Sequence, residues 1–123
     1  AVRDFTEAIR LDGSNVDAYY NRGVAYAHLQ QPIMAVDDFT ITLNMNSEHI
    51  DAYNNRAAAY LDLDQLSQAI RDAEEAIRRN DQLPRAFLIR GAARALLGQE
   101  ELANEDREKA RSLGANNIPG IDL

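Results

Sequence analysis

Apolar residues recur along this chain at the three- and four-residue spacing of amphipathic helices, and the alternation typical of strands is absent. Clusters of Gly, Asn, Ser and Gln separate the periodic stretches. Pro32 and Pro84 stand where helices would begin, and a proline there loses no helical hydrogen bond. The pattern predicts seven helices, over residues 1–11, 16–29, 32–45, 50–63, 66–79, 84–97 and 100–112, followed by an irregular tail at 115–123.

The chain also repeats itself at a fixed interval, the one that separates Asp17 from Asp51. The segment DAYYNRGVAY at 17–26 aligns without a gap with DAYNNRAAAY at 51–60, and a weaker third copy follows in register from Arg85. The start of the chain matches the second half of a copy. One helix pair cannot bury its apolar face alone, so stacked neighbours must form the core. We therefore expect one all-α domain over residues 1–123, with a half repeat at 1–15, repeats at 16–49, 50–83 and 84–117, and a tail at 118–123.

Small residues recur at the predicted helix contacts. Gly23, Ala57 and Gly91 share one position of the repeat, and Ala35 and Ala69 share another on the second helix. Because these residues have little or no side chain, the two helices of a pair can approach closely. Aromatic residues on either side fill the remaining space and bury large apolar areas.

Charge and composition exclude several classes of function. The 123 residues carry 20 acids and 13 bases, for a net charge of -7, with 46% hydrophobic residues and no Cys. The acidic balance argues against nucleic acid and against an anionic membrane surface as partners. The lack of Cys excludes disulfides and thiolate sites. No apolar run approaches the length of a membrane span and no signal peptide is visible, so a cytoplasmic location is expected.

Catalytic and metal chemistry find no support in the residue pattern. The two histidines, His28 and His49, lack ligand spacing, and adjacent carboxylates such as Glu74 and Glu75 splay apart on a helix. No Gly-rich phosphate loop or nucleophile motif is present. We expect no catalytic residue, no metal and no cofactor.

Arginine and aspartate recur with the repeat. The positions are Arg22, Arg56 and Arg90, and Asp4, Asp38, Asp72 and Asp106. Each Arg follows an Asp at one constant spacing, across one repeat junction. We expect ion pairs between adjacent repeats, Arg56 with Asp38 and Arg90 with Asp72, since the planar guanidinium suits a carboxylate. A charged binding strip is the alternative.

A helix pair repeated at this interval resembles the tetratricopeptide repeat. The residues that carry the resemblance are Tyr19, Gly23, Tyr26, Ala35 and Thr42, then Tyr53, Ala57, Tyr60, Ala69 and Ala76, then Phe87, Gly91, Ala103 and Ala110. Arg94 and Arg107 depart from the pattern, where an aromatic and a large apolar residue are usual. The resemblance implies a right-handed α-solenoid whose first helices line a concave groove that holds a peptide.

Carried over by position, the resemblance implies a groove formed by the first helix of each repeat. The expected partner-binding residues are Tyr20, Asn21, Val24, Asn54, Asn55, Arg85, Leu88, Ile89 and Leu96, with Asp17, His28, Asp51, Ala58, Asp62 and Ala92 beside them. An Asn side chain offers a donor and an acceptor to a peptide backbone. Leu88, Ile89 and Leu96 are apolar on a face expected to be exposed, so they either bind an apolar group or are covered by the tail or another chain.

The resemblance also suggests one particular ligand, which the residues of this chain disfavour. Some tetratricopeptide proteins grip the acidic tails of heat-shock chaperones with a clamp of Lys, Asn and Arg. Only two of the five positions of this clamp are matched here, one by Asn55 and one by Arg85. The acidic surface would also repel such a tail.

The expected function is a non-catalytic protein–protein interaction module that presents its groove to a partner peptide or helix. The alternative is a structural or oligomerising segment of a longer array. The stripe of Val2, Phe5, Ile9 and Leu11 should pack on the first full repeat, with its open side covered by another chain, as in a homodimer, or by upstream residues. The polar last helix is expected to cap the array. We expect Ile89→Asp to weaken binding without unfolding the chain.

Overall fold

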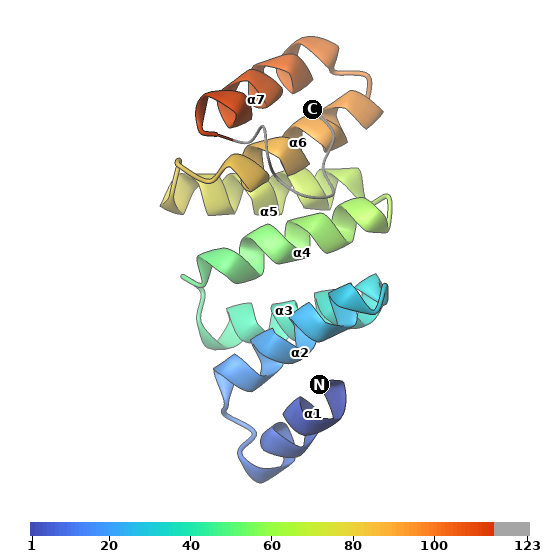
Figure 1. Ribbon diagram of the computed structural model, residues 1–123, viewed down its shortest axis with the longest axis vertical. Coiled ribbons are helices and arrows are strands. Elements are labelled where there is room, and N and C mark those ends of the chain that lie inside the picture. The colour runs from blue at the N-terminus through green and yellow to red at the C-terminus, as the bar shows by residue number, and fades with distance from the viewer. Residues whose placement is uncertain (115–123) are drawn as a thin grey trace.

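The computed structural model describes residues 1–114, which form seven α-helices joined by short turns (Figure 1). The helices are α1 (Val2–Leu11), α2 (Val16–His28), α3 (Pro32–Met45), α4 (Ile50–Asp62), α5 (Leu66–Arg79), α6 (Pro84–Leu96) and α7 (Glu100–Ser112). All seven predicted helices are confirmed, with ends that differ by at most one residue. The predicted irregular tail lies outside the described residues.

Local interactions explain where the helices begin and end. The Asn15 side chain accepts a hydrogen bond from the Ala18 amide at the start of α2, and His49 Nδ1 does the same for the Ala52 amide at the start of α4. Pro32 opens α3 and Pro84 opens α6. The turn after each first helix holds one residue with positive φ, and these residues, Gln30, Asp64 and Gly98, occupy the same position of the repeat.

The helices stack in chain order, from α1 at one end of Figure 1 to α7 at the other. Each repeat is an antiparallel pair, α2 with α3, α4 with α5 and α6 with α7, and the second helix of a pair contacts the first helix of the next. Contacts also join α2 to α4 and α4 to α6. The first helices therefore form one layer of an all-α helical repeat and the second helices form the other. No helix in residues 1–114 combines the length and apolar character that a membrane crossing needs.

The core depends on small residues opposite large ones. Gly23 faces Phe39, and a Cβ at Gly23 would lie only 2.7 Å from Phe39 Cε1. In the second repeat the same two positions hold Ala57 and Ala73, which pack in one buried cluster. The close approach expected for the helix pairs is thus present, and its details differ from repeat to repeat.

The Arg and Asp residues form ion pairs, but not the ones expected. The pairs are Arg22 with Asp38, Arg56 with Asp72, and Arg90 with Asp106, at 2.7 to 2.8 Å. The prediction that Arg56 reaches Asp38 and Arg90 reaches Asp72 was wrong. Each Arg lies on a first helix and meets the Asp on the second helix of its own pair, not the Asp of the preceding repeat. Contact with the preceding repeat comes instead from the Thr40 hydroxyl, which lies 3.1 Å from Arg56 Nη1, and from the Glu74 carboxylate, which lies 3.5 Å from Arg90 Nη1.

The two ends of the stack differ in how they are closed. In α1, Val2, Phe5 and Ile9 are half-buried while Leu11 is 72% exposed, and the helix has no fully buried residue. Its packing on α2 agrees with expectation; what covers its open side stays a prediction. At the other end, Arg94 bonds the buried Asp106 at 2.8 Å. This bond accommodates the unusual Arg in the last pair.

Candidate binding groove

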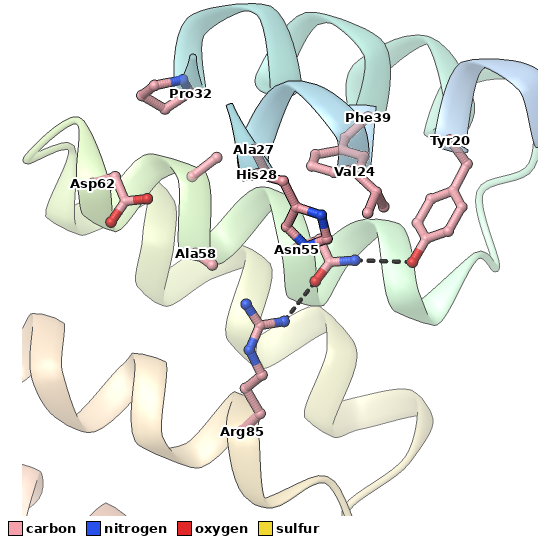
Figure 2. Close-up of a pocket in the computed structure, with 11 residues that line it drawn as sticks. Tyr20, Val24, Ala27, His28, Pro32, Phe39, Asn55, Ala58, Asp62 and Arg85 are labelled. Atoms are coloured by element: carbon pink, nitrogen blue, oxygen red, sulfur yellow. Dashed lines mark hydrogen bonds between the residues drawn. The ribbon is translucent and has the colours of Figure 1, made fainter. Parts of the chain in front are cut away.

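A cavity of about 410 Å³ opens on the layer of first helices (Figure 2). Its lining comes from α2, α3, α4 and α6, and therefore from all three full repeats. The lining residues are Tyr20, Val24, Ala27, His28, Pro32, Phe39, Asn55, Ala58, Ala59, Asp62 and Arg85.

Three of these side chains form a hydrogen-bonded chain across the stack (Figure 2). Arg85 Nη1 on α6 donates to Asn55 Oδ1 on α4 at 2.5 Å, and Asn55 Nδ2 donates to the Tyr20 hydroxyl on α2 at 2.9 Å. Because both ends of the Asn55 amide are used, its orientation is fixed. The Tyr20 hydroxyl accepts this bond and keeps its own proton to donate. Within residues 1–114, Arg85 has no carboxylate partner, so its remaining N–H groups can bind a ligand.

The Tyr20 ring is held firmly at its end of the cavity. Its centroid lies 4.6 Å from that of His49 and 5.8 Å from that of Phe39. Burial raises the pKa of Tyr20, and the nearby charge of Asp51 raises it further, against the opposing effects of the Asn55 hydrogen bond and of Arg85. Tyr20 is therefore neutral at physiological pH and presents a hydroxyl donor.

The rest of the cavity is lined by apolar side chains and by His28, with one acid at its far end. Val24, Phe39 and Ala58 line the middle, and Asp62 lies beside Pro32 at the end away from Tyr20 (Figure 2). Asp62 is exposed and makes no ion pair within the described part of the chain. The cavity thus offers hydrogen-bond donors at one end, apolar contact and the His28 imidazole in the middle, and a carboxylate at the other end (Figure 2). Residues 1–114 contain no cluster of three His, Cys, Asp or Glu side chains able to hold a metal ion.

The structure brings together four of the residues expected to bind a partner. Tyr20, Val24, Asn55 and Arg85 line the cavity, as do His28, Ala58 and Asp62 from the wider set. Asn21 is exposed outside it, and Leu96 is 65% exposed near the end of α6. Sequence reasoning missed Ala27, Pro32, Phe39 and Ala59. Ala27 lies three residues after Val24, so helical spacing could have found it, whereas Phe39 on the second helix gave no such signal.

Three expected lining residues are instead buried. Leu88 packs with Phe87 and Ala110, and Ile89 packs with Ala57 and Ala73; only 5% and 4% of the two residues is exposed. The expectation that they stand on an exposed face was wrong, because neighbouring helices cover that face of α6. Ile89→Asp would therefore place a charge in the core and destabilise the fold.

Asn54 is the third buried residue, with 9% of its surface exposed. Its Oδ1 has no hydrogen-bond partner among residues 1–114. This oxygen is held away from water, so the Asn54 side chain is not a surface that a partner could contact freely. Its neighbour in sequence, Asn55, is the Asn of this helix that faces the cavity.

Comparison with known proteins agrees with the repeat pattern. Two family models, each described as tetratricopeptide repeat, match residues 5–37 and 50–83. The solved Arabidopsis OM64 TPR domain is 30% identical, with 83% of this chain and 84% of that chain covered and a TM-score of 0.81. The first TPR of Spaghetti (RPAP3) bound to HSP90 peptide SRMEEVD is 28% identical, with 87% and 85% covered and a TM-score of 0.80.

A third structure shows the same fold at lower identity. The crystal structure of MamA is 22% identical, with 93% of this chain and 67% of that chain covered and a TM-score of 0.88. The search of the curated proteins gave no match.

Proposed function

Because the chain belongs to the tetratricopeptide repeat family, a fold of protein–protein interaction modules, we propose that it binds an extended peptide segment of a partner protein in the cavity between α2, α4 and α6. The proposed role is non-catalytic. The observation that carries it is the chain of Arg85, Asn55 and Tyr20, which spans three repeats and leaves donors free beside the apolar side chains of the cavity. Free polar groups beside apolar contact area are what an extended peptide backbone and its side chains require.

The related complex supports peptide binding but not the same peptide. The HSP90 peptide SRMEEVD that Spaghetti binds contains three acidic residues. Here Asp62 lines the cavity, Asp17 and Asp51 are exposed on the same helix layer, and Arg85 is the one Lys or Arg that residues 1–114 contribute to the lining. Like charges facing a ligand oppose its binding. We therefore propose a partner segment that is not uniformly acidic.

A structural role in a longer array is the second candidate. The open side of α1, where Leu11 is 72% exposed, favours it, because a preceding helix or another chain would cover this surface. The two functions involve different surfaces, so a variant that fills the cavity separates them.

The test is a selection of random displayed peptides on the purified chain, followed by affinity measurement with the best peptide. Ala58→Arg places a long side chain in the cavity, and the matched control Gln68→Arg adds the same side chain at an exposed position on α5. We expect Ala58→Arg to weaken binding by at least about tenfold, a loss of about 1.4 kcal/mol, and Gln68→Arg to leave it unchanged. If no peptide is enriched, or if both variants bind like the wild type, the proposed function is wrong.

A further inference from the structure

A second pocket lies outside the groove, at the turn between α2 and α3. It has a volume of about 420 Å³ and is lined by Gln30, Gln31, Pro32, Ile33, Met34 and Leu63. Ile33 is 65% exposed and Met34 is 43% exposed. We call this surface the edge pocket. Neither of its two exposed apolar side chains belongs to a buried core cluster.

The repeats themselves provide a comparison for these two residues. The positions equivalent to Ile33 and Met34 hold Ser67 and Gln68 in the second repeat, and Glu101 and Leu102 in the third. All three helix pairs form with these different residues, so the fold does not require an apolar pair there. Of the three full repeats, the first alone exposes two adjacent apolar side chains at this position, whereas the third exposes Leu102 next to Glu101. With Leu63, Ile33 and Met34 form an apolar surface of the kind that partners contact.

The edge pocket is continuous with the cavity of the groove. Pro32 lines both. A further hollow of about 360 Å³ lies between them, lined by Ala27, Gln30, Pro32 and Asp62, so it shares residues with each. A ligand in the groove that passes Asp62 and crosses Pro32 therefore enters the edge pocket.

The charges of Arg85 and Asp62 indicate which charged residues a ligand along this path would have. The Arg85 guanidinium binds at Asn55, and Asp62 lies seven residues further along α4, or about 10 Å at the rise of a helix. An extended peptide covers that distance in about three residues. Neither Arg85 nor Asp62 has an oppositely charged partner within residues 1–114, and residues 1–83 hold fourteen acids against seven bases. An acidic ligand residue at Arg85 and a basic one at Asp62 would complement both charges.

We propose that the partner segment leaves the groove over Pro32, pairs a Lys or Arg with Asp62, and buries a large apolar side chain against Ile33, Met34 and Leu63. The inference rests on the proposed function and specifies its ligand. The segment carries an acidic residue, a basic residue about three positions away, and an aliphatic or aromatic residue within about the next three. A uniformly acidic segment lacks the last two features.

The test uses the peptide with the highest affinity from the displayed library, labelled for fluorescence anisotropy. Ile33→Ser/Met34→Gln installs the residues of the second repeat, and Asp62→Asn removes the carboxylate. The control Leu102→Gln changes the exposed residue equivalent to Met34 in the third repeat. We expect the double variant to weaken binding by about tenfold, Asp62→Asn to weaken it by about threefold, and the control to bind like the wild type.

The outcomes separate this inference from the proposed function. If Ala58→Arg abolishes binding while the double variant and Asp62→Asn bind like the wild type, the groove is the site and the inference is overturned. If Ala58→Arg has no effect, the proposed function fails first. Sedimentation tests whether a second copy of this chain covers the edge pocket instead. If the wild type is a dimer and the double variant is a monomer, the second copy is the occupant and the inference is overturned. Circular dichroism confirms that each variant is folded.

Discussion

The contact between Gly23 and Phe39 gives a prediction whose sign depends on context. Replacing a mid-helix Gly with Ala ordinarily stabilises a protein by about 0.5–1 kcal/mol. Here the added Cβ would lie 2.7 Å from Cε1 and 2.9 Å from Cδ1 of Phe39. Phe39 is fully buried and packs against the Tyr20 ring on α2, so it cannot move aside freely. Gly23→Ala should therefore destabilise this chain.

The expected magnitude follows from two opposing terms. Overpacking a core costs about 1–3 kcal/mol, and the gain in helix propensity returns up to about 1 kcal/mol. The free energy of unfolding should fall by about 1–2 kcal/mol. In a Phe39→Ala background the obstructing ring is absent, and the pair becomes Ala opposite Ala, as Ala57 and Ala73 are in the second repeat. There Gly23→Ala should stabilise by about 0.5–1 kcal/mol.

The assay is urea denaturation of the wild type, both single variants and the double variant, followed by circular dichroism. Phe39→Ala alone costs about 3–5 kcal/mol, so the measurements are made at low temperature, where this variant must show a cooperative transition. The reasoning is refuted if Gly23→Ala stabilises the wild type, or if it destabilises both backgrounds equally.

Three further predictions concern buried polar groups. Asn54→Leu should raise the free energy of unfolding by about 1–2 kcal/mol in urea denaturation, because it removes an Oδ1 that has no partner within residues 1–114. If Asn54→Leu instead lowers the free energy of unfolding by that amount, this oxygen has a partner. Asp72→Ala should lower the free energy of unfolding by about 3 kcal/mol, because Arg56 loses its carboxylate partner. The double variant Arg56→Met/Asp72→Leu should lower it far less, and an equal decrease in the two variants would contradict this. Burial raises the pKa of Tyr20, so its contribution to stability is present below the ordinary tyrosine pKa and is lost as pH rises through the raised value. Ultraviolet titration should show a late component that Tyr20→Phe removes, and an unchanged curve for Tyr20→Phe would contradict this.

The helices and their pairing could be predicted because the information is local and repeated. The fixed repeat interval places equivalent residues in each helix pair, and the prolines at 32 and 84 mark the starts of two helices in the sequence. The side-chain caps at Asn15 and His49 became evident only in the structure. The cavity was predicted in part for the same reason, since Tyr20, Asn55 and Arg85 follow from their positions in the repeat.

The sequence could not show which neighbouring helix each helix face packs against. Helical spacing places Leu88 and Ile89 away from their pair's contact, but it does not show that they pack into two buried clusters. Similarly, Arg56 has Asp38 before it and Asp72 after it, at nearly equal separations along the chain. Only the packing of the two helices decides between them. Periodicity specifies the helix face, whereas contacts between helices require coordinates.

The central claim is that a partner peptide occupies the cavity between α2, α4 and α6. The most direct measurement is a nuclear magnetic resonance titration of the wild-type chain with the selected peptide, observing the side-chain amide of Asn55 and the methyl group of Ala58. Both line the cavity, and the Asn55 amide bonds Tyr20 and Arg85. The account predicts that both signals shift and saturate with the affinity measured by anisotropy. A peptide that binds with that affinity while both signals stay unmoved would contradict it.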